Sequence, residues 1–521
     1  MEMLRAACLA ALFLFGLVVG AIAEDVTLIS RDGKMQISGT ILGYDGEFYR
    51  LDTVYGELTV DGSAVRCTGP GCPDIAAYVA EVRIAGARRM GAVLMPALIE
   101  SFAARNGYRT RIEATSDTRF TFSLIEKDSG RIAARLHFDL STTAEGFARL
   151  AAEEADLVLA VREPSAQEIA AQIAAGQGDP SAPHRSIVVA LDALVAVVAP
   201  GNPVRQIAME DLAGVFAGEI GDWKELGWPE GPIGLHLGPA GSGPAELFTA
   251  KVLAPSGRRL APAVARHASY AELADAVARD LLAIGVSTLS ELGNTAAMAI
   301  AGGCGIHARA DPVSVKTEDY PLTMPLFVYL PPRRLPLVIR EFLRFLRSPA
   351  AQPVIRRAGF VDLGLDAVGI EAQGVRLANA ITAAGEETPL AELQRLVWLM
   401  RGVKRLSIAF RFRDGAAELD AQSRSNVELL ADQLEAGAFD DHRLVFVGFS
   451  DGQGSARANL ALARRRAETV REAVLAAAPL ADRRRVAATV DAFGEAMPLA
   501  CDDSDWGRAV NRRVEVWVAH K

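Results

Sequence analysis

Histidine, cysteine and aromatic residues are scarce in this chain of 521 residues, which has seven histidines, five cysteines and an aromatic content of 6%. The histidines are scattered without the short spacings of metal ligands, so we predict no metal site and no cofactor. Basic residues form only short arginine runs, and the formal net charge is −9. Because binding to a phosphate backbone requires clustered lysine and arginine, nucleic acid is excluded as the main partner.

Long apolar runs are also missing, with one exception at the N-terminus. Arg5 precedes an apolar run at 6–19, and the small residues at 21–23 suit a cleavage site. This pattern predicts a secretory signal peptide at 1–23 and export to the periplasm, although a retained N-terminal anchor helix is the alternative. No second apolar stretch is long enough to cross a membrane, so we expect no membrane span after the signal is removed.

The five cysteines divide into three groups. Cys8 is lost with the signal peptide. Cys67 and Cys72 enclose a turn-rich Thr-Gly-Pro-Gly segment, which predicts a small disulfide loop in an oxidising compartment. Half of a zinc site is the rival interpretation, but no second pair of cysteine or histidine lies nearby. Cys304 and Cys501 are far apart, and the sequence does not decide whether they pair.

The pattern of apolar residues predicts a multidomain protein. Residues 24–77 alternate β-branched runs with Asp-Gly and Tyr-Gly turns, which predicts a small all-β module, either a five-stranded meander or a small barrel. In 78–365 strands alternate with helices, so we expect an α/β domain of two lobes with a cleft between them. A helical linker is expected at 366–402, followed by a compact α+β domain at 403–521.

The last domain contains four motifs in a fixed order. They are Gly448-Phe449-Ser450-Asp451, Asn459-Leu460-Ala461-Leu462-Ala463, Arg465-Arg466-Ala467 and the closing Asn511-Arg512-Arg513-Val514-Glu515. Together they resemble the OmpA-like peptidoglycan-binding domain, with Ser450 in place of the usual threonine and Ala463 in place of the usual serine. The resemblance implies attachment to the cell wall, and hence a location in the periplasm at the wall or the outer membrane.

By this resemblance, Asp451 and Arg466 bind the diaminopimelate of the peptidoglycan stem. That residue carries an ammonium and a carboxylate on one carbon, so a carboxylate and a guanidinium can bind both charges at once. Asn459 is expected to orient the loop, and Arg512 or Arg513 to support the site. The alternative is a simple surface ion pair between Asp451 and Arg466, which would contribute little to stability.

The central domain resembles the phosphate-binding receptors of ABC importers, which have a type 2 periplasmic-binding-protein fold. The matching features are an aspartate-containing strand at 191–198, Asn202-Pro203, the segment 211–223 ending in Trp223, and Ser242-Gly243. The resemblance implies a small anion such as phosphate as ligand and an ABC importer as a further partner.

Receptors of this type hold an oxyanion with helix N-termini, hydroxyl groups and one arginine. The candidate ligand residues are Arg88, Arg89, Ser141, Thr142, Arg162, Ser242 and Gly243. The chain departs from the family pattern where Gly238 stands for the usual arginine and Pro244 for a threonine, and proline has no N–H to donate. Arg88, Arg89 or Arg162 would then have to supply the missing charge.

These features predict an exported solute-binding protein tethered to peptidoglycan and not an enzyme. The glycine-rich segment 238–243 lacks the Gly-Lys-Ser/Thr of a nucleotide-binding loop, and Ser242 does not lie in a nucleophile elbow. The alternative function is a wall-anchored scaffold whose receptor domain has lost its small ligand, as the changes at Ala87, Gly238 and Pro244 would allow.

Overall fold

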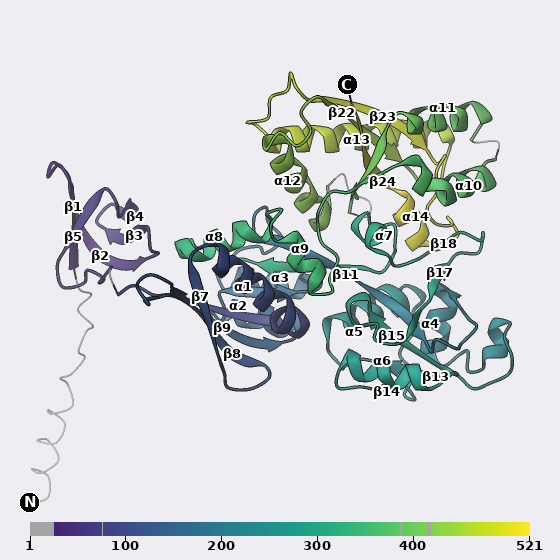
Figure 1. Ribbon diagram of the computed structural model, residues 1–521, viewed down its shortest axis with the longest axis horizontal. Coiled ribbons are helices and arrows are strands. Elements are labelled where there is room, and N and C mark those ends of the chain that lie inside the picture. Colours follow the sequence, from purple (N-terminus) through teal and green to yellow (C-terminus); the bar gives the residue numbers. More distant parts are fainter. Residues whose placement is uncertain (1–24, 76, 386–387, 414–417, 521) are drawn as a thin grey trace, which may run out of the picture. The chain divides into compact units, whose positions relative to one another are not determined.

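The computed structural model describes residues 25–75, 77–385, 388–413 and 418–520 (Figure 1). The predicted signal peptide and Cys8 lie outside this range. The chain divides into two compact units, and each is described by itself. The first runs to Ala80 and includes Ile132–Ala134 and Arg333–Glu341, and the second contains the rest. Among the described residues, no helix has the length and apolar character needed to span a membrane.

The first unit is built on a five-stranded antiparallel sheet, as predicted. Its strands are β1 (Asp25–Ser30), β2 (Gln36–Tyr44), β3 (Phe48–Thr53), β4 (Gly56–Asp61) and β5 (Val65–Thr68), in the order β4-β3-β2-β1-β5. Alternate residues of β1 and β3 point into a small core, with Leu28 and Leu51 almost fully buried. Gly46 and Gly56 adopt positive φ angles of 92° and 94° in the turns, which suits glycine. The predicted Cys67–Cys72 disulfide is present.

The α/β domain of the second unit has two lobes. The first lobe contains β6 (Ala80–Ala87), β7 (Tyr108–Ala114), β8 (Arg119–Glu126), β9 (Ile132–Ser141), β10 (Leu157–Ala160), α1 (Met95–Arg105), α2 (Thr143–Ala151), α3 (Ala166–Ala174), α8 (Leu337–Leu346) and α9 (Gln352–Arg357). The second contains β13 (Gly234–Leu237), β14 (Ala265–Arg266), β15 (Ala283–Thr288), α4 (Met209–Ala217), α5 (Gly243–Phe248) and α6 (Tyr270–Arg279).

One long strand joins the lobes. Strand β11 (Ser186–Val198) pairs with β19 (Thr323–Tyr329) along its first part and with β15 along its last part. All of its residues from Val188 onward are buried, which matches the nearly continuous apolar run in the sequence. The two-lobed α/β architecture expected from the sequence is therefore confirmed.

The C-terminal domain is an α+β sandwich. Its sheet has the order β20-β21-β24-β22-β23, from β20 (Ala367–Val368), β21 (Lys404–Phe410), β22 (His442–Phe449), β23 (Ala487–Gly494) and β24 (Arg513–His520). The helices are α10 (Gly374–Ala383), α11 (Leu390–Arg401), α12 (Ala421–Glu435), α13 (Ala456–Ala477) and α14 (Asp505–Asn511). Helices α12 and α13 share a core with one face of the sheet, and α10 and α11 share a core with residues of the other face.

The predicted helical linker at 366–402 is therefore not a free connection. Its helices are present, but Leu396 and Met400 of α11 are buried in one cluster with Trp517 of β24. In addition, β20 pairs with β21 and so extends the C-terminal sheet. Burial of these apolar side chains makes the segment part of the C-terminal domain.

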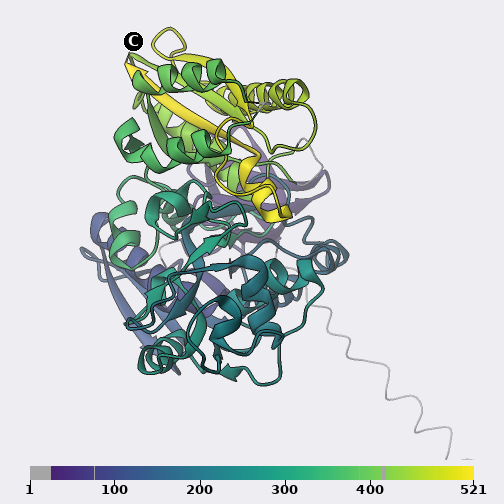
Figure 2. The same cartoon turned by 90° about the vertical axis from the view of Figure 1, so that its right-hand side faces the viewer.

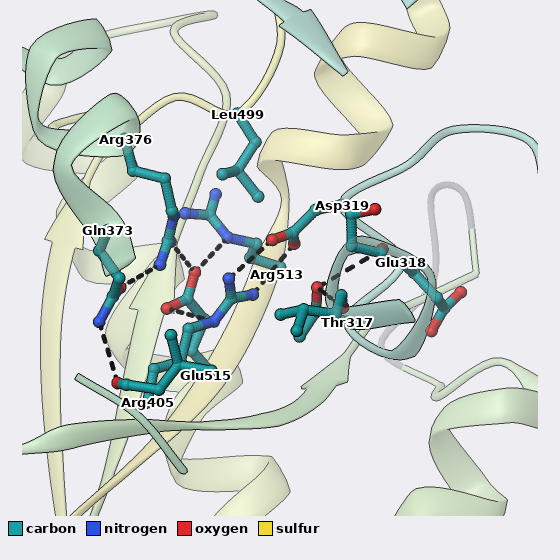
Figure 3. Close-up of polar contacts among 12 residues, drawn as sticks. Thr317, Glu318, Asp319, Gln373, Arg376, Arg405, Leu499, Arg513 and Glu515 are labelled. Atoms are coloured by element: carbon teal, nitrogen blue, oxygen red, sulfur yellow. Dashed lines mark hydrogen bonds and ion pairs between the residues drawn. The ribbon is translucent and has the colours of Figure 1, made fainter. Parts of the chain in front are cut away.

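Several contacts join the C-terminal domain to the α/β domain, including ion pairs of Arg347 with Glu428 and Asp432. Two further links lie around Cys501 and Arg405. One is a disulfide between Cys304 and Cys501, which answers the question that the sequence left open. In both views the yellow α14 region lies beside the teal-green α/β domain (Figures 1 and 2). The other link is a buried ion pair, in which the guanidinium of Arg405 donates hydrogen bonds of 2.6 and 3.0 Å to the carboxylate of Asp319 (Figure 3).

Glu515 lies at the centre of the same cluster and is fully buried. Its carboxylate accepts hydrogen bonds from Arg376, from Arg513 at 2.7 Å and from the indole N–H of Trp517 at 2.8 Å, and Arg405 lies 3.1 Å away. Burial alone would raise the pKa of Glu515, but the three neighbouring guanidiniums outweigh it and hold this pKa well below its usual range. Glu515 is therefore ionised at neutral pH and balances charge in the interior.

We predict that Glu515→Gln lowers the free energy of unfolding by roughly 3–5 kcal/mol, because it leaves buried guanidiniums without a compensating charge. Urea unfolding of the full chain, followed by tryptophan fluorescence, measures the loss. Glu472→Gln is the control, since the side chain of Glu472 is 71% exposed. A loss of the same size in both variants would contradict the role assigned to Glu515.

Candidate functional site

A close approach of β22 to α13 positions the predicted wall-binding residues. A Cβ atom at Gly448 would lie 2.0 Å from the carbonyl oxygen of Ala463, so only glycine fits at this contact. The strand ends one residue later, and the loop that carries Asp451 leads back into the N-terminus of α13, which Ser455 caps. This packing places Asp451 close to the helix that carries Arg466.

Asp451 and Arg466 do not form an ion pair with each other in the part of the chain that the structure describes. Asp451 instead accepts a hydrogen bond of 2.9 Å from Nη1 of Arg512 and one of 3.2 Å from the backbone N–H of Gln453. The surface-pair alternative is therefore wrong. Arg512 therefore holds the carboxylate of Asp451, and its supporting role in wall binding stays a prediction.

Arg466 is the unusual member of this site. Its Nη1 atom is buried and has no hydrogen-bond partner among the described residues, and its guanidinium lies 5.4 Å from the centre of the Phe412 ring. Burial and the nearby charge of Arg512 lower the pKa of Arg466, and Asp451 opposes them. A buried donor without a partner is costly, so the site is prepared for an acceptor such as a carboxylate.

Further residues hold the loop in place. Asn459 donates from Nδ2 to Glu495 at 3.1 Å, and the orienting role expected for it stays a prediction. Asp502 accepts from the backbone N–H of Gly452 at 2.7 Å and from Nδ2 of Asn511 at 2.9 Å. Glu495 and Asp502 lie outside the four sequence motifs and were not predicted as site residues, whereas Asn511 belongs to the closing motif.

Arg513 requires a correction. We predicted that it supports the wall-binding site, but its side chain is fully buried. It donates to Glu515 and, at 3.0 Å, to the carbonyl oxygen of Met497, and its guanidinium lies 4.2 Å from the centre of the Phe449 ring. Arg513 is the first residue of β24, whereas Arg512 is the residue that ends α14, so different elements position the two side chains.

The predicted anion site of the α/β domain is partly occupied by the protein's own contacts. Arg162 pairs with Glu168 at 2.8 Å and with Glu246 of the second lobe at 3.0 Å, and these carboxylates raise its pKa. There is no room for a side chain at Gly243, since a Cβ atom there would lie 2.0 Å from Cγ2 of Val161. Arg162 is therefore not a free replacement charge, and Gly243 serves the contact between the lobes.

Hydroxyl groups at the two helix starts have different roles. Thr142 caps α2 by accepting from the N–H of Glu145 at 3.1 Å. Ser242 caps α5 and lies 3.0 Å from the hydroxyl of Tyr270. By contrast, Oγ of Ser141 is buried and has no hydrogen-bond partner among the described residues. Of the three predicted hydroxyls, Ser141 is the one left available to a ligand.

The two neighbouring arginines at the end of β6 also differ. Arg88 is exposed, whereas Arg89 extends toward the second lobe. There Arg89 lies 3.5 Å from Glu291 and donates at 3.3 Å to the carbonyl oxygen of Ser290, while its buried Nε has no partner in the described chain. Arg89 is thus the predicted arginine best placed to bind an anion.

Asp192 on β11 lies close to this region and was not predicted as a site residue. It is almost fully buried and accepts hydrogen bonds from Oγ of Ser290 at 2.6 Å and from the N–H groups of Ser290 and Ala193. Burial raises the pKa of Asp192 to about 6, and these hydrogen bonds oppose the rise. Within the described ranges, no group of three or more His, Cys, Asp or Glu side chains could hold a metal ion.

The architecture defines a two-lobed binding domain joined to an α+β wall-binding domain, and sequence comparison assigns both to families. A PBP superfamily domain matches residues 77–350, more than half of the chain, so the protein belongs to the PBP superfamily. The OmpA family matches residues 411–512. These two matches together support a protein associated with the cell envelope.

Individual relatives are distant. Protein SphX from Synechococcus elongatus is 26% identical over 236 residues, which cover 43% of this chain and 68% of SphX. An ABC-type phosphate transport receptor from Vibrio cholerae aligns at 17% identity with a TM-score of 0.40, over 54% of this chain and 99% of the receptor. The peptidoglycan-associated lipoprotein from Burkholderia pseudomallei aligns at 23% identity with a TM-score of 0.19, over 21% and 88%.

The raised pKa of Asp192 predicts a pH dependence of stability. Between about pH 4, where an unfolded aspartate titrates, and about pH 6, the folded state binds more protons than the unfolded state. The free energy of unfolding should therefore fall by about 3 kcal/mol as the pH rises through this window. Asp192→Asn should remove this contribution.

Urea unfolding of the full chain from pH 4 to pH 7 tests this. Asp275→Asn is the control, because the Asp275 side chain is 69% exposed. A difference between wild type and Asp192→Asn that stays constant with pH would contradict the assignment.

Proposed function

We propose that this protein is a periplasmic solute-binding protein anchored to peptidoglycan, and that it binds its ligands without catalysing a reaction. The observation that carries the proposal is the buried Nη1 of Arg466, which has no hydrogen-bond partner among the described residues and lies beside the Asp451–Arg512 pair. The signal peptide at 1–23 would supply export. An ABC importer as partner stays a prediction from the sequence.

The two kinds of charge at the wall site suit the free end of diaminopimelate. The carboxylate of that end would accept hydrogen bonds from Arg466, which gains the partner it lacks. Its ammonium would approach Asp451, whose carboxylate Arg512 already orients. A ligand that lacks either charge would leave Arg466 or Asp451 without an opposite charge from the ligand.

Arg466→Ala should reduce retention on purified peptidoglycan at least tenfold, because it removes the donor for the ligand carboxylate. Cosedimentation of the full chain with wall sacculi measures the retention. Arg465→Ala is the matched control, since Arg465 is the exposed neighbour on the same helix. If both variants sediment like the wild type, wall binding through Arg466 is ruled out.

The α/β domain is proposed to bind a small oxyanion near Ser141 and Arg89. Both side chains have buried polar atoms that no described residue pairs with. Both also lie at the ends of first-lobe strands, where α2 and the helix after β6 begin. The N–H groups at such helix starts add further donors to an oxyanion. Phosphate is the proposed ligand because its four oxygens match a set of hydroxyl, guanidinium and backbone donors.

Calorimetric titration of the full chain with phosphate and sulfate tests this assignment. Arg89→Ala and Ser141→Ala should each weaken phosphate binding about tenfold or more, because each removes a hydrogen-bond donor from a desolvated site. Arg88→Ala should bind like the wild type, since its side chain is exposed. The absence of heat with both anions would contradict the assignment.

A scaffold without a small ligand is the second candidate function. It is favoured by the contacts that close the lobes on each other, namely the Arg162–Glu246 pair and the packing of Gly243 on Val161. The titration decides between the two functions, because a scaffold would bind peptidoglycan and give no heat with phosphate or sulfate.

A further inference from the structure

A cavity lies where the C-terminal domain meets the second lobe, and none of the candidate wall-site or anion-site residues lines it. It has a volume of about 580 Å³ and is lined by residues of α4, of 250–256, of 318–323 and of α14. Lys251, Glu318, Tyr320, Arg411 and Trp506 are among them. Its size is within the range of small-molecule sites, which often lie between domains.

Glu318 is the unusual residue of this cavity. Its backbone adopts a φ of +53°, a left-handed conformation that residues with a side chain adopt at a cost. Its Oε1 atom is buried and has no hydrogen-bond partner in the described part of the chain. Figure 3 shows the side chain pointing away from the Asp319–Arg405 pair. Backbone strain and an unsatisfied buried oxygen at one residue are typical of a functional position.

The two arginines that line the cavity already have hydrogen-bond partners within the protein. Arg411 donates at 2.7 Å to the carbonyl oxygen of Glu318 and at 2.7 Å to that of Val510. Arg508 is held by Asp505 and by the carbonyl oxygen of Asp502. Neither guanidinium is free to pair with the carboxylate of Glu318.

Lys251 supplies the opposite charge at the exposed side of the cavity. It lines the same space as Glu318, and no ion pair between the two lies within 4 Å. One cavity therefore presents an acidic and a basic side chain that do not form an ion pair with each other. A ligand that carries both charges could satisfy each group with its opposite.

We propose that this cavity binds a zwitterionic ligand of the amino-acid type, up to the size of a dipeptide, with its ammonium on Glu318 and its carboxylate on Lys251. Pro321 and Trp506, both partly exposed, provide apolar surface for the body of the ligand. This site is independent of the proposed wall and anion sites.

The carboxylates near Glu318 favour the binding of a cation beside it. Burial and the carboxylates of Asp420 and Asp319 raise the pKa of Glu318 to about 8, while Arg411 and Lys251 act in the opposite direction. A ligand ammonium beside Glu318 would favour the ionised carboxylate.

Calorimetric titration of the full chain with the common amino acids and a set of dipeptides, including glycylglycine and alanylphenylalanine, tests the proposal. At least one should bind the wild type, and its N-acetylated form, which lacks the ammonium, should bind at least tenfold more weakly. Glu318→Gln should weaken binding by a similar factor. Glu153→Gln is the matched control, because Glu153 is an exposed glutamate with a left-handed φ of 57°.

A second variant separates ligand binding from stability. Glu318→Gly should abolish binding and raise Tm, because glycine adopts the left-handed backbone readily and the buried carboxyl oxygen is removed. A purely structural role for Glu318 would lower Tm instead. The proposal is overturned if no ligand of the panel binds the wild type, or if Glu318→Gln binds as tightly as the wild type. Arg466→Ala should keep amino-acid binding, so a failure of the wall site would be seen separately.

Discussion

The guanidinium of Arg405 is shared between Glu515 in the C-terminal domain and Asp319 in the α/β domain, and the second unit depends on this arrangement. Arg405 is almost fully buried, so neither carboxylate could remain charged at this place without it. Arg376 and Arg513 complete the charge balance around Glu515. Such a cluster tolerates little displacement of one domain against the other, because every lost contact leaves a buried charge. The binding domain and the wall-binding domain are therefore held in one arrangement.

The same reasoning distinguishes residues that support the structure from residues that await a ligand. Arg162 and Arg513 have all the partners they need from this chain, and both connect parts of the fold. Arg466, Arg89 and Ser141 have buried polar atoms that the described chain leaves unsatisfied. Since proteins pair nearly all their buried polar groups, these exceptions are the places where an outside molecule is expected. Residue type alone does not make this distinction, because four of these five residues are arginines with charged neighbours.

Local sequence patterns predicted the order of the domains and most of their fold. The turns of the β module, the apolar run of β11 and the closely spaced motif around Asp451 all act over a few residues, so the sequence displays them directly. The errors concern contacts between distant segments. Glu246 lies 84 positions from Arg162, and Asp502 lies 50 positions from Gly452. No motif near Arg162 or Gly452 in the sequence indicates that Glu246 or Asp502 is its partner. The role of 366–402 was missed for the same reason, because its buried face is completed by β24.

The Cys304–Cys501 disulfide has a consequence for the way the protein is made. The two cysteines are separated by 197 residues, and the second lies 20 residues before the C-terminal Lys521. If the chain is exported from its N-terminus, Cys304 reaches the oxidising compartment long before its partner does. During that interval it is a free thiol, whereas Cys67 and Cys72 of the β module, which precede it in the chain, can already form their disulfide. Correct pairing therefore depends on Cys67 and Cys72 closing their short loop first, so that Cys304 finds no competing thiol within its own chain.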